Sequence, residues 1–301
     1  MSRRLDIKKH LTEAREVILN GGVNCIPLRF LRFRSELPGI RRKFYYLVSG
    51  ATKSGKTQIT TFLFIITPIL YYLEHPERVK PTIHVFPLEE TEEDITLRFY
   101  SYVLYYITDG RIRLSPEELE SVDERYPLSQ EVLDLMDSEE FIRLSDLFDE
   151  CVIFHNQRNP TGIYKTMKSY MEEHGDVKYK QEVIKYKDEF GLDKEEIVNK
   201  IVQYTPHNPN EYVIFIVDHV GLLQCENGKS LKDTIEKLSE YCVILRNRYS
   251  TIPVIVQQQN SETTNLEAFK SLKIRPTKDG LKDSKRTGED KRHISKYLKS
   301  S

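Results

Sequence analysis

A glycine-bounded stretch, Gly50-Ala51-Thr52-Lys53-Ser54-Gly55-Lys56-Thr57, fits the pattern GxxxxGK(S/T) at every fixed position. Glycines let the backbone bend so that successive N–H groups point at phosphates, and a following helix N-terminus adds partial positive charge. We expect Lys56 to reach the β- and γ-phosphates and the Thr57 hydroxyl to bind Mg²⁺. A chance Gly-Lys-Thr turn is disfavoured, because an apolar run precedes the loop and a helical pattern follows it. The motif predicts nucleoside triphosphate binding but not the reaction.

Such a loop needs a carboxylate at a nearby strand end to hold Mg²⁺. Asp218 closes the apolar run 213–217 and is the expected metal residue, although it could simply cap the strand. Many ATPases place a glutamate directly after this aspartate to orient the attacking water. This chain has His219 there. The metal residue is therefore predicted here, but the catalytic base must come from elsewhere.

The next strand end to supply an acid is that of the run 82–88, which Glu89 and Glu90 follow. We expect Glu89 to lie on a strand beside the one that leads into the glycine-rich loop, within reach of a γ-phosphate. The alternative is that both acids only begin the next helix, whose N-terminus favours negative charge. The polar run 257–260 closes a further apolar strand, and it is either a phosphate sensor or an ordinary polar loop.

Apolar runs and helical periodicity alternate along the chain. Strands are predicted at 44–49, 82–88, 151–155, 212–217 and 253–257. Helices are predicted at 7–20, at 56–74 with a kink at Pro68, at 91–107, within the acidic stretch 113–150, from 160 to about 173, at 176–204 as a charged insertion, and at 230–249. The alternation predicts an α/β fold with a mainly parallel sheet between helices.

The composition is that of a globular chain with an uneven charge distribution. Of 301 residues, 39% are apolar and 30% are charged, and the net charge is −1. Residues 1–43 and 270–301 each carry 11 basic and 4 acidic residues, which leaves −15 for the rest. The basic ends either solubilise the chain or contact a polyanion.

Four scattered cysteines without CxxC spacing are typical of a reducing compartment, so a cytoplasmic location is expected, in the host cytoplasm if the chain is viral. The longest apolar run, 62–73, is too short to span a bilayer, and no membrane association is expected.

These pieces, in this order, resemble the RecA-like P-loop ATPase domain of DnaB-type replicative DNA helicases, including phage versions. The resemblance covers roughly residues 23–290. It rests on the loop 50–57, on Pro87-Leu88-Glu89-Glu90 with Arg98 in the next helix, on the run 216–223 that includes Asp218, on Pro253 to Gln259, and on Leu281-Lys282-Asp283-Ser284. It implies that Glu89 is the catalytic base and that Gln259 senses the γ-phosphate.

The resemblance also implies ATP and Mg²⁺ as cofactors, single-stranded DNA as a partner, a homohexameric ring, and contact with primase or other replisome proteins. DNA would be held by the loops after the fourth and fifth strands and by basic residues of the tail. The expected tail contacts are Lys273, Arg275, Lys278 and Lys282. Their alternative is a solvated tail.

The implied organisation is a basic N-terminal segment at 1–43 with a linker helix, an ATPase core at 44–260 with a helical insertion at about 113–210, and a basic segment at 261–301. The family's C-terminal strands and its Lys-x-Arg arginine finger are not recognised before Ser301. Two alternatives to a helicase subunit therefore stay open. One is a RecA-like DNA-bound ATPase that does not unwind, and the other is a non-catalytic nucleotide-binding assembly partner.

Overall fold

The computed structural model describes residues 3–187, 193–226 and 228–259. Its centre is a five-stranded sheet in the order β3-β9-β8-β4-β5, and every neighbouring pair is parallel. The strands are β3 (Tyr46–Gly50), β4 (Lys80–Pro87), β5 (Val152–Phe154), β8 (Glu211–Asp218) and β9 (Ile252–Gln258). All five predicted strands are present to within a few residues, and the prediction of a mainly parallel α/β sheet is confirmed.

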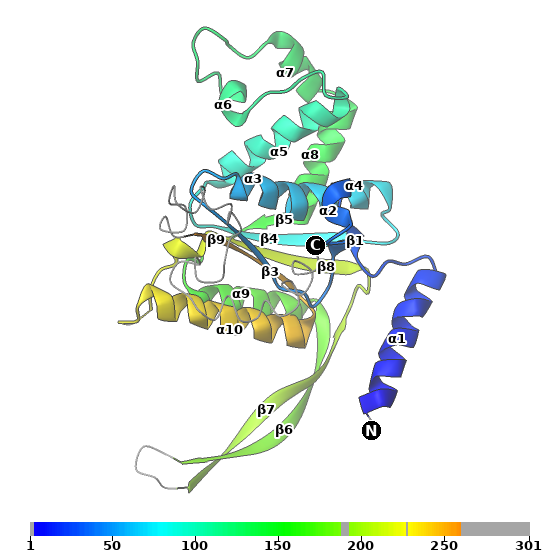
Figure 1. The fold of residues 1–301 in the computed structure, drawn as a ribbon, viewed down its shortest axis with the longest axis vertical. Coiled ribbons are helices and arrows are strands. Elements are labelled where there is room, and N and C mark those ends of the chain that lie inside the picture. The colour runs from blue at the N-terminus through cyan, green and yellow to red at the C-terminus, as the bar shows by residue number, and fades with distance from the viewer. Residues whose placement is uncertain (1–2, 188–192, 227, 260–301) are drawn as a thin grey trace, which may run out of the picture.

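Helices cover both faces of this sheet (Figure 1). One face carries α3 (Lys56–Thr61), α4 (Thr67–Glu74), α5 (Glu92–Ile107) and α8 (Glu139–Cys151), and the other carries α9 (Pro160–Glu173) and α10 (Leu231–Tyr249). Alternate residues of a strand point to opposite faces. In β8, Ile214 and Ile216 accordingly join one apolar core, whereas Phe215 and Val217 join the other. The continuous apolar run that predicted this strand reflects burial on both sides.

Smaller elements complete the described chain. They are α1 (Arg3–Leu19), β1 (Ile26–Pro27), α2 (Leu31–Arg34), β2 (Gly39–Ile40), a π-helical turn (Phe62–Ile66), α6 (Pro116–Leu119), α7 (Gln130–Met136), β6 (Gly175–Lys187), β7 (Asp193–Pro206) and a 3₁₀ turn (Val220–Leu222). The helix α1 has no buried residue. Among the described residues, no helix is both long and apolar enough to cross a membrane.

The predicted kink at Pro68 takes the form of the π-helical turn just before it. Proline cannot donate a hydrogen bond, and its ring clashes with the carbonyl four residues earlier in a continuing α-helix. The wider turn restarts the helix so that Pro68 falls in the first turn of α4, where no N–H is needed. The Thr67 hydroxyl donates to the Phe62 carbonyl at 2.8 Å within this turn.

The prediction of a charged helix at 176–204 is wrong, because β6 and β7 form a long antiparallel hairpin there. The lysines and glutamates of this stretch favour helices, but β-branched and aromatic residues recur among them and favour strands. Tyr179 pairs with Ile201, and Val183 pairs with Ile197. The hairpin projects from the body beside α9 and α10 (Figure 1). The stretch 113–210 is therefore not an all-helical insertion, since it also contains β5 of the central sheet.

The base of the hairpin is fastened to the core by hydrogen bonds from tyrosine hydroxyls. Tyr179 donates to Glu172 Oε1 at 2.9 Å, and Tyr249 at the end of α10 donates to the same oxygen at 2.8 Å. The Tyr204 ring meets the Tyr249 ring edge-on, with centroids 5.3 Å apart. The last two contacts join residues far apart in sequence, and together with the first they hold the base of the hairpin against α9 and α10.

Candidate active site

The glycine-rich loop has the strand–loop–helix setting that the sequence predicts. It leaves β3 at Gly50 and enters α3 at Lys56, and Gly55 just before the helix has a left-handed backbone with φ of 77°. A Cβ on Gly50 would lie 2.5 Å from Ser54 Oγ, so a larger residue there would require the Ser54 side chain to move. The Lys56 ammonium donates to the Ala51 carbonyl at 2.8 Å, which places its charge over the loop.

Two residues at the end of β9 donate hydrogen bonds to this loop. The backbone N–H of Gln259 donates to the Gly50 carbonyl at 2.9 Å, and Gln258 Nε2 donates to the Thr52 hydroxyl. The side chain of Gln259 is buried, and its Nε2 has no hydrogen-bond partner within the described residues. The polar run that closes β9 therefore lies against the phosphate-binding loop. The sequence did not single out Gln258, although its neighbour Gln259 was predicted.

Asp218 lies beside Thr57, as predicted for two residues that share one metal. The Thr57 hydroxyl donates to the Asp218 carboxylate. Burial raises the pKa of Asp218 to about 6, and the nearby Glu90 and Glu89 add to this, while Thr57 and Lys56 act in the opposite direction. Its Oδ1 atom is buried and has no hydrogen-bond partner among the described residues. Mg²⁺ prefers oxygen ligands of this kind, so the residues fit the metal that the loop implies.

Glu89 reaches the same edge of the sheet, although not by the predicted route. The strand β4 is not beside β3, because β9 and β8 lie between them. It is the neighbour of β8 instead, and Pro87 is in register with Asp218. The backbone N–H of Glu89 donates to the Asp218 carbonyl at 3.3 Å, and the Glu89 carboxylate lies 3.4 Å from His219 Nε2. The prediction that Glu89 joins this end of the sheet holds, but the predicted strand order is wrong.

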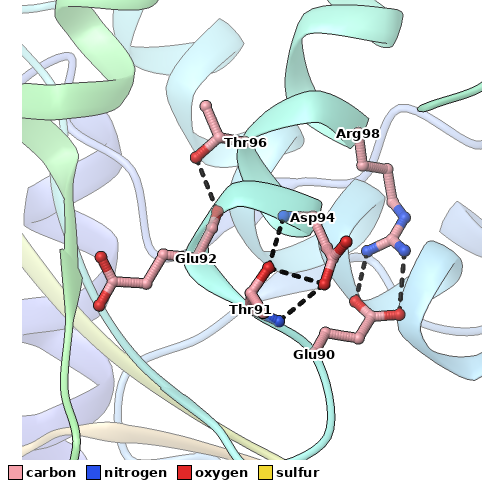
Figure 2. A network of polar contacts seen from close by, with 6 residues as sticks. All are labelled: Glu90, Thr91, Glu92, Asp94, Thr96 and Arg98. Atoms are coloured by element: carbon pink, nitrogen blue, oxygen red, sulfur yellow. Dashed lines mark hydrogen bonds and ion pairs between the residues drawn. The ribbon is translucent and has the colours of Figure 1, made fainter. Parts of the chain in front are cut away.

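Glu90 has a different set of partners (Figure 2). Arg98 of α5 donates to both of its carboxylate oxygens, at 2.7 and 3.0 Å. Thr91 and Asp94 then close the helix N-terminus with reciprocal hydrogen bonds. Both oxygens of the Glu90 carboxylate are thus occupied by the arginine. Glu89, with a side chain 55% exposed, is the better placed of the two acids for chemistry.

The site therefore brings together the loop 50–57, Asp218, Glu89 and Gln259 at the carboxyl ends of the strands. Ligands of open α/β sheets bind at this edge. The predicted nucleic-acid contacts Lys273, Arg275, Lys278 and Lys282 lie outside the described residues.

Comparison with known proteins supports the fold. No family model matches the chain, and no curated protein matches it. A solved structure described as a DnaB-like replicative helicase and its interactions with primase is similar, with a TM-score of 0.59 and 12% identity. The similarity covers 94% of this chain and 54% of the other, so this chain spans about half the length of that helicase. The similarity confirms the predicted RecA-like α/β fold, in which a mainly parallel sheet lies between helices.

Proposed function

We propose that this chain is an ATP-driven DNA helicase subunit of the DnaB type, which couples ATP hydrolysis to movement along single-stranded DNA. The observation that carries the proposal is the convergence of Thr57, Asp218 and Glu89 at one sheet edge beside a phosphate-binding loop. Phosphate-binding loops occur in many proteins, but hydrolysis also needs a metal carboxylate and a proton acceptor at the same place. The fold similarity to a DnaB-like helicase supports the choice of motor.

The residues take the following parts in this proposal. Backbone N–H groups of 50–57 and the Lys56 ammonium bind the ATP phosphates. Thr57 and Asp218 hold Mg²⁺, which supplies charge neutralisation on the phosphates when it is bound. Glu89 accepts a proton from the attacking water. Gln259 senses the γ-phosphate through its buried amide, next to the loop.

The contacts with DNA and other proteins belong to the same proposal. We assign DNA binding to the loop after β8 and to the basic tail with Lys273, Arg275, Lys278 and Lys282, because phosphate neutralisation supplies much of nonspecific affinity. We also propose a homohexameric ring, with 1–43 as a linker segment, 44–260 as the motor and 261–301 as a basic arm. The similar helicase is described with primase, which makes primase or another replisome protein the expected partner.

The test is ATP turnover by the purified chain with and without single-stranded DNA, followed by strand displacement on a forked duplex. We expect DNA-stimulated turnover and ATP-dependent displacement, and Lys56→Ala serves as the inactive control. Turnover without displacement would favour a DNA-bound ATPase that does not unwind. If the chain binds triphosphate but shows no turnover at any chain concentration, the result would favour the alternative that it is a non-catalytic assembly partner.

The source of an arginine finger can be tested in the same assay. In related phosphoryl-transfer systems a finger supplied by a neighbour contributes about 10³–10⁵ in turnover. The basic tail offers Lys285, Arg286 and Arg292. A fast intact chain that becomes slow when it ends near Gly280, or when Arg286 is changed to alanine, would assign the finger to the tail. Equal, slow turnover of both chains would assign it elsewhere.

A further inference from the structure

The segment that joins β5 to α9, residues 155–159, touches both the strand end that carries Glu89 and the loop that follows Asp218. We propose that Arg158 in this segment is a positioning residue, which sets the orientation of Glu89 and links it to the loop residues 219–226. The proposal rests on the proposed function, because it assigns a role to Arg158 in that ATPase reaction.

The first contact of Arg158 is with the peptide group that precedes Glu89. Its guanidinium donates to the Leu88 carbonyl at 2.5 Å. The N–H of the same peptide group belongs to Glu89 and donates to the Asp218 carbonyl. The peptide between Leu88 and Glu89 is thus held at both of its polar ends. The orientation of this peptide sets the direction in which the Glu89 side chain leaves the backbone, and a misplacement of about 1 Å can cost ~10²-fold in rate.

The second contact of Arg158 is with the loop after β8. Its backbone carbonyl accepts a hydrogen bond from the Gln224 N–H at 2.8 Å. Two residues further along, the Glu226 carboxylate accepts from the Thr161 N–H at 2.9 Å and from the Thr161 hydroxyl at 3.0 Å. Lys237 of α10 also donates to Glu226. The loop is therefore tied at two points to the start of α9, directly beside Arg158.

The other end of the segment is fixed to the sheet by His155. The backbone N–H of His155 donates to the Val85 carbonyl at 2.9 Å, and the His155 ring stacks on the Phe86 ring with centroids 4.8 Å apart. Its Nε2 lies 2.8 Å from Nδ1 of the buried His84. Because His155 holds this end of the segment to β4, a displacement of residues 219–226 acts on Arg158 and does not move the whole segment. DNA that shifts this loop would therefore change the hydrogen bond from Arg158 to the Leu88 carbonyl.

The experiment compares Arg158→Ala and Arg158→Lys with Arg143→Ala, a control at an exposed arginine of α8. Turnover at saturating ATP, the Kd for a fluorescent ATP analogue, the melting temperature and the stimulation by single-stranded DNA are measured for each. For Arg158→Ala we expect turnover to fall by about 10–100-fold, with an unchanged Kd and melting temperature. Arg158→Lys should recover part of the loss, since its ammonium can still donate. The control should match the unmodified chain.

A second variant separates the link to the loop from the orientation of Glu89. Glu226→Ala removes the tie to Thr161 but keeps the contact between Arg158 and Leu88. At saturating single-stranded DNA, where a weaker affinity of this loop for DNA has no effect, we expect the ratio of its turnover with DNA to its turnover without DNA to fall by about fivefold or more, the size of a typical coupling between two sites.

Three results would overturn the proposal. The first is an Arg158→Ala variant with unmodified turnover and stimulation. The second is a parallel loss of nucleotide affinity, melting temperature and turnover, which would mark a merely structural arginine. The third is a Glu226→Ala variant with unmodified stimulation by DNA, which would remove the link to the loop. An unmodified chain without any turnover would instead refute the proposed ATPase function itself.

Discussion

Replacing Asp218 with asparagine should stabilise the protein in the absence of Mg²⁺ while it destroys the metal site. Burial raises the pKa of Asp218 from its usual 3.8 to about 6, so the folded protein favours the neutral acid. At pH 7 the residue is nevertheless ionised, with a buried oxygen that lacks a hydrogen-bond partner among the described residues. The folded state therefore carries a charge that is better solvated in the unfolded chain. Asparagine has a similar shape and no charge.

The size of the effect follows from the pKa. The difference between 3.8 and about 6, at ~1.4 kcal/mol for each pH unit, amounts to about 3 kcal/mol. An acid with a raised folded-state pKa contributes stability below its unfolded pKa, and this contribution is lost as pH rises through the folded pKa. The free energy of unfolding of Asp218→Asn should thus exceed that of the unmodified chain by about 1–3 kcal/mol at pH 7. The difference should shrink between pH 6 and pH 4.

The assay is urea denaturation in EDTA at pH 7, 6 and 4, followed by the same series with Mg²⁺ and ATP. In EDTA we expect the variant to unfold at higher urea than the unmodified chain at pH 7, and at nearly the same urea at pH 4. With Mg²⁺ and ATP the unmodified chain should gain more stability than the variant, and this extra gain should weaken below pH 6, as Asp218 becomes protonated. A variant that is less stable than the unmodified chain in EDTA at pH 7 would refute the reasoning.

Three further changes test other contacts of the site and the fold. Lys56→Ala should abolish turnover and weaken triphosphate binding in equilibrium titration, because it removes the ammonium that the loop places beside the phosphates; unmodified turnover would refute the loop assignment. Glu89→Gln should keep ATP binding and cut turnover by about 10²–10⁴-fold. Glu90→Gln should act mainly by weakening the hydrogen bonds with Arg98. If only Glu90→Gln loses turnover, Glu90 and not Glu89 is the catalytic base. Glu172→Ala should lower the free energy of unfolding by about 1–3 kcal/mol, because it leaves the Tyr249 hydroxyl unpaired, with exposed Glu173→Ala as the control in the same urea titration.

The sequence predicted those parts of the site whose chemistry is written in consecutive residues. The loop 50–57 and the acid that ends β8 follow from local pattern, because strand ends of a parallel sheet meet at one edge. The order of the strands does not follow from local pattern. Glu89 was expected on a neighbour of β3, but β4 pairs with β8 instead. Its contact with Asp218 arises from that pairing.

The hairpin at 175–206 was mispredicted for a related reason. Ten lysines and glutamates are interleaved there with twelve β-branched and aromatic residues, and the prediction of a helix gave the charged residues too much weight. The pairing of the two strands builds the hairpin, and a hydrogen bond from Tyr179 to Glu172 of α9 adds to it at the base. β-propensity reflects how a residue packs against its cross-strand neighbours, and pairs such as Tyr179 with Ile201 become visible only when the partner strand is known.

The assignment of the two adjacent acids shows how chemistry depends on partners far away in the chain. By residue type Glu89 and Glu90 are interchangeable, and the sequence left both as simple helix-starting acids in one interpretation. Arg98, two turns into α5, donates hydrogen bonds to both carboxylate oxygens of Glu90. Glu89 is instead held through its backbone, by Asp218 on one side and, through Leu88, by Arg158 on the other, which leaves its carboxylate beside His219 at the mouth of the site. Glu89 has no bidentate arginine on its carboxylate, so in the proposed reaction it is the acid that accepts the proton. The two glutamates therefore differ in role because of their partners, Arg98 for Glu90 and Arg158 for Glu89.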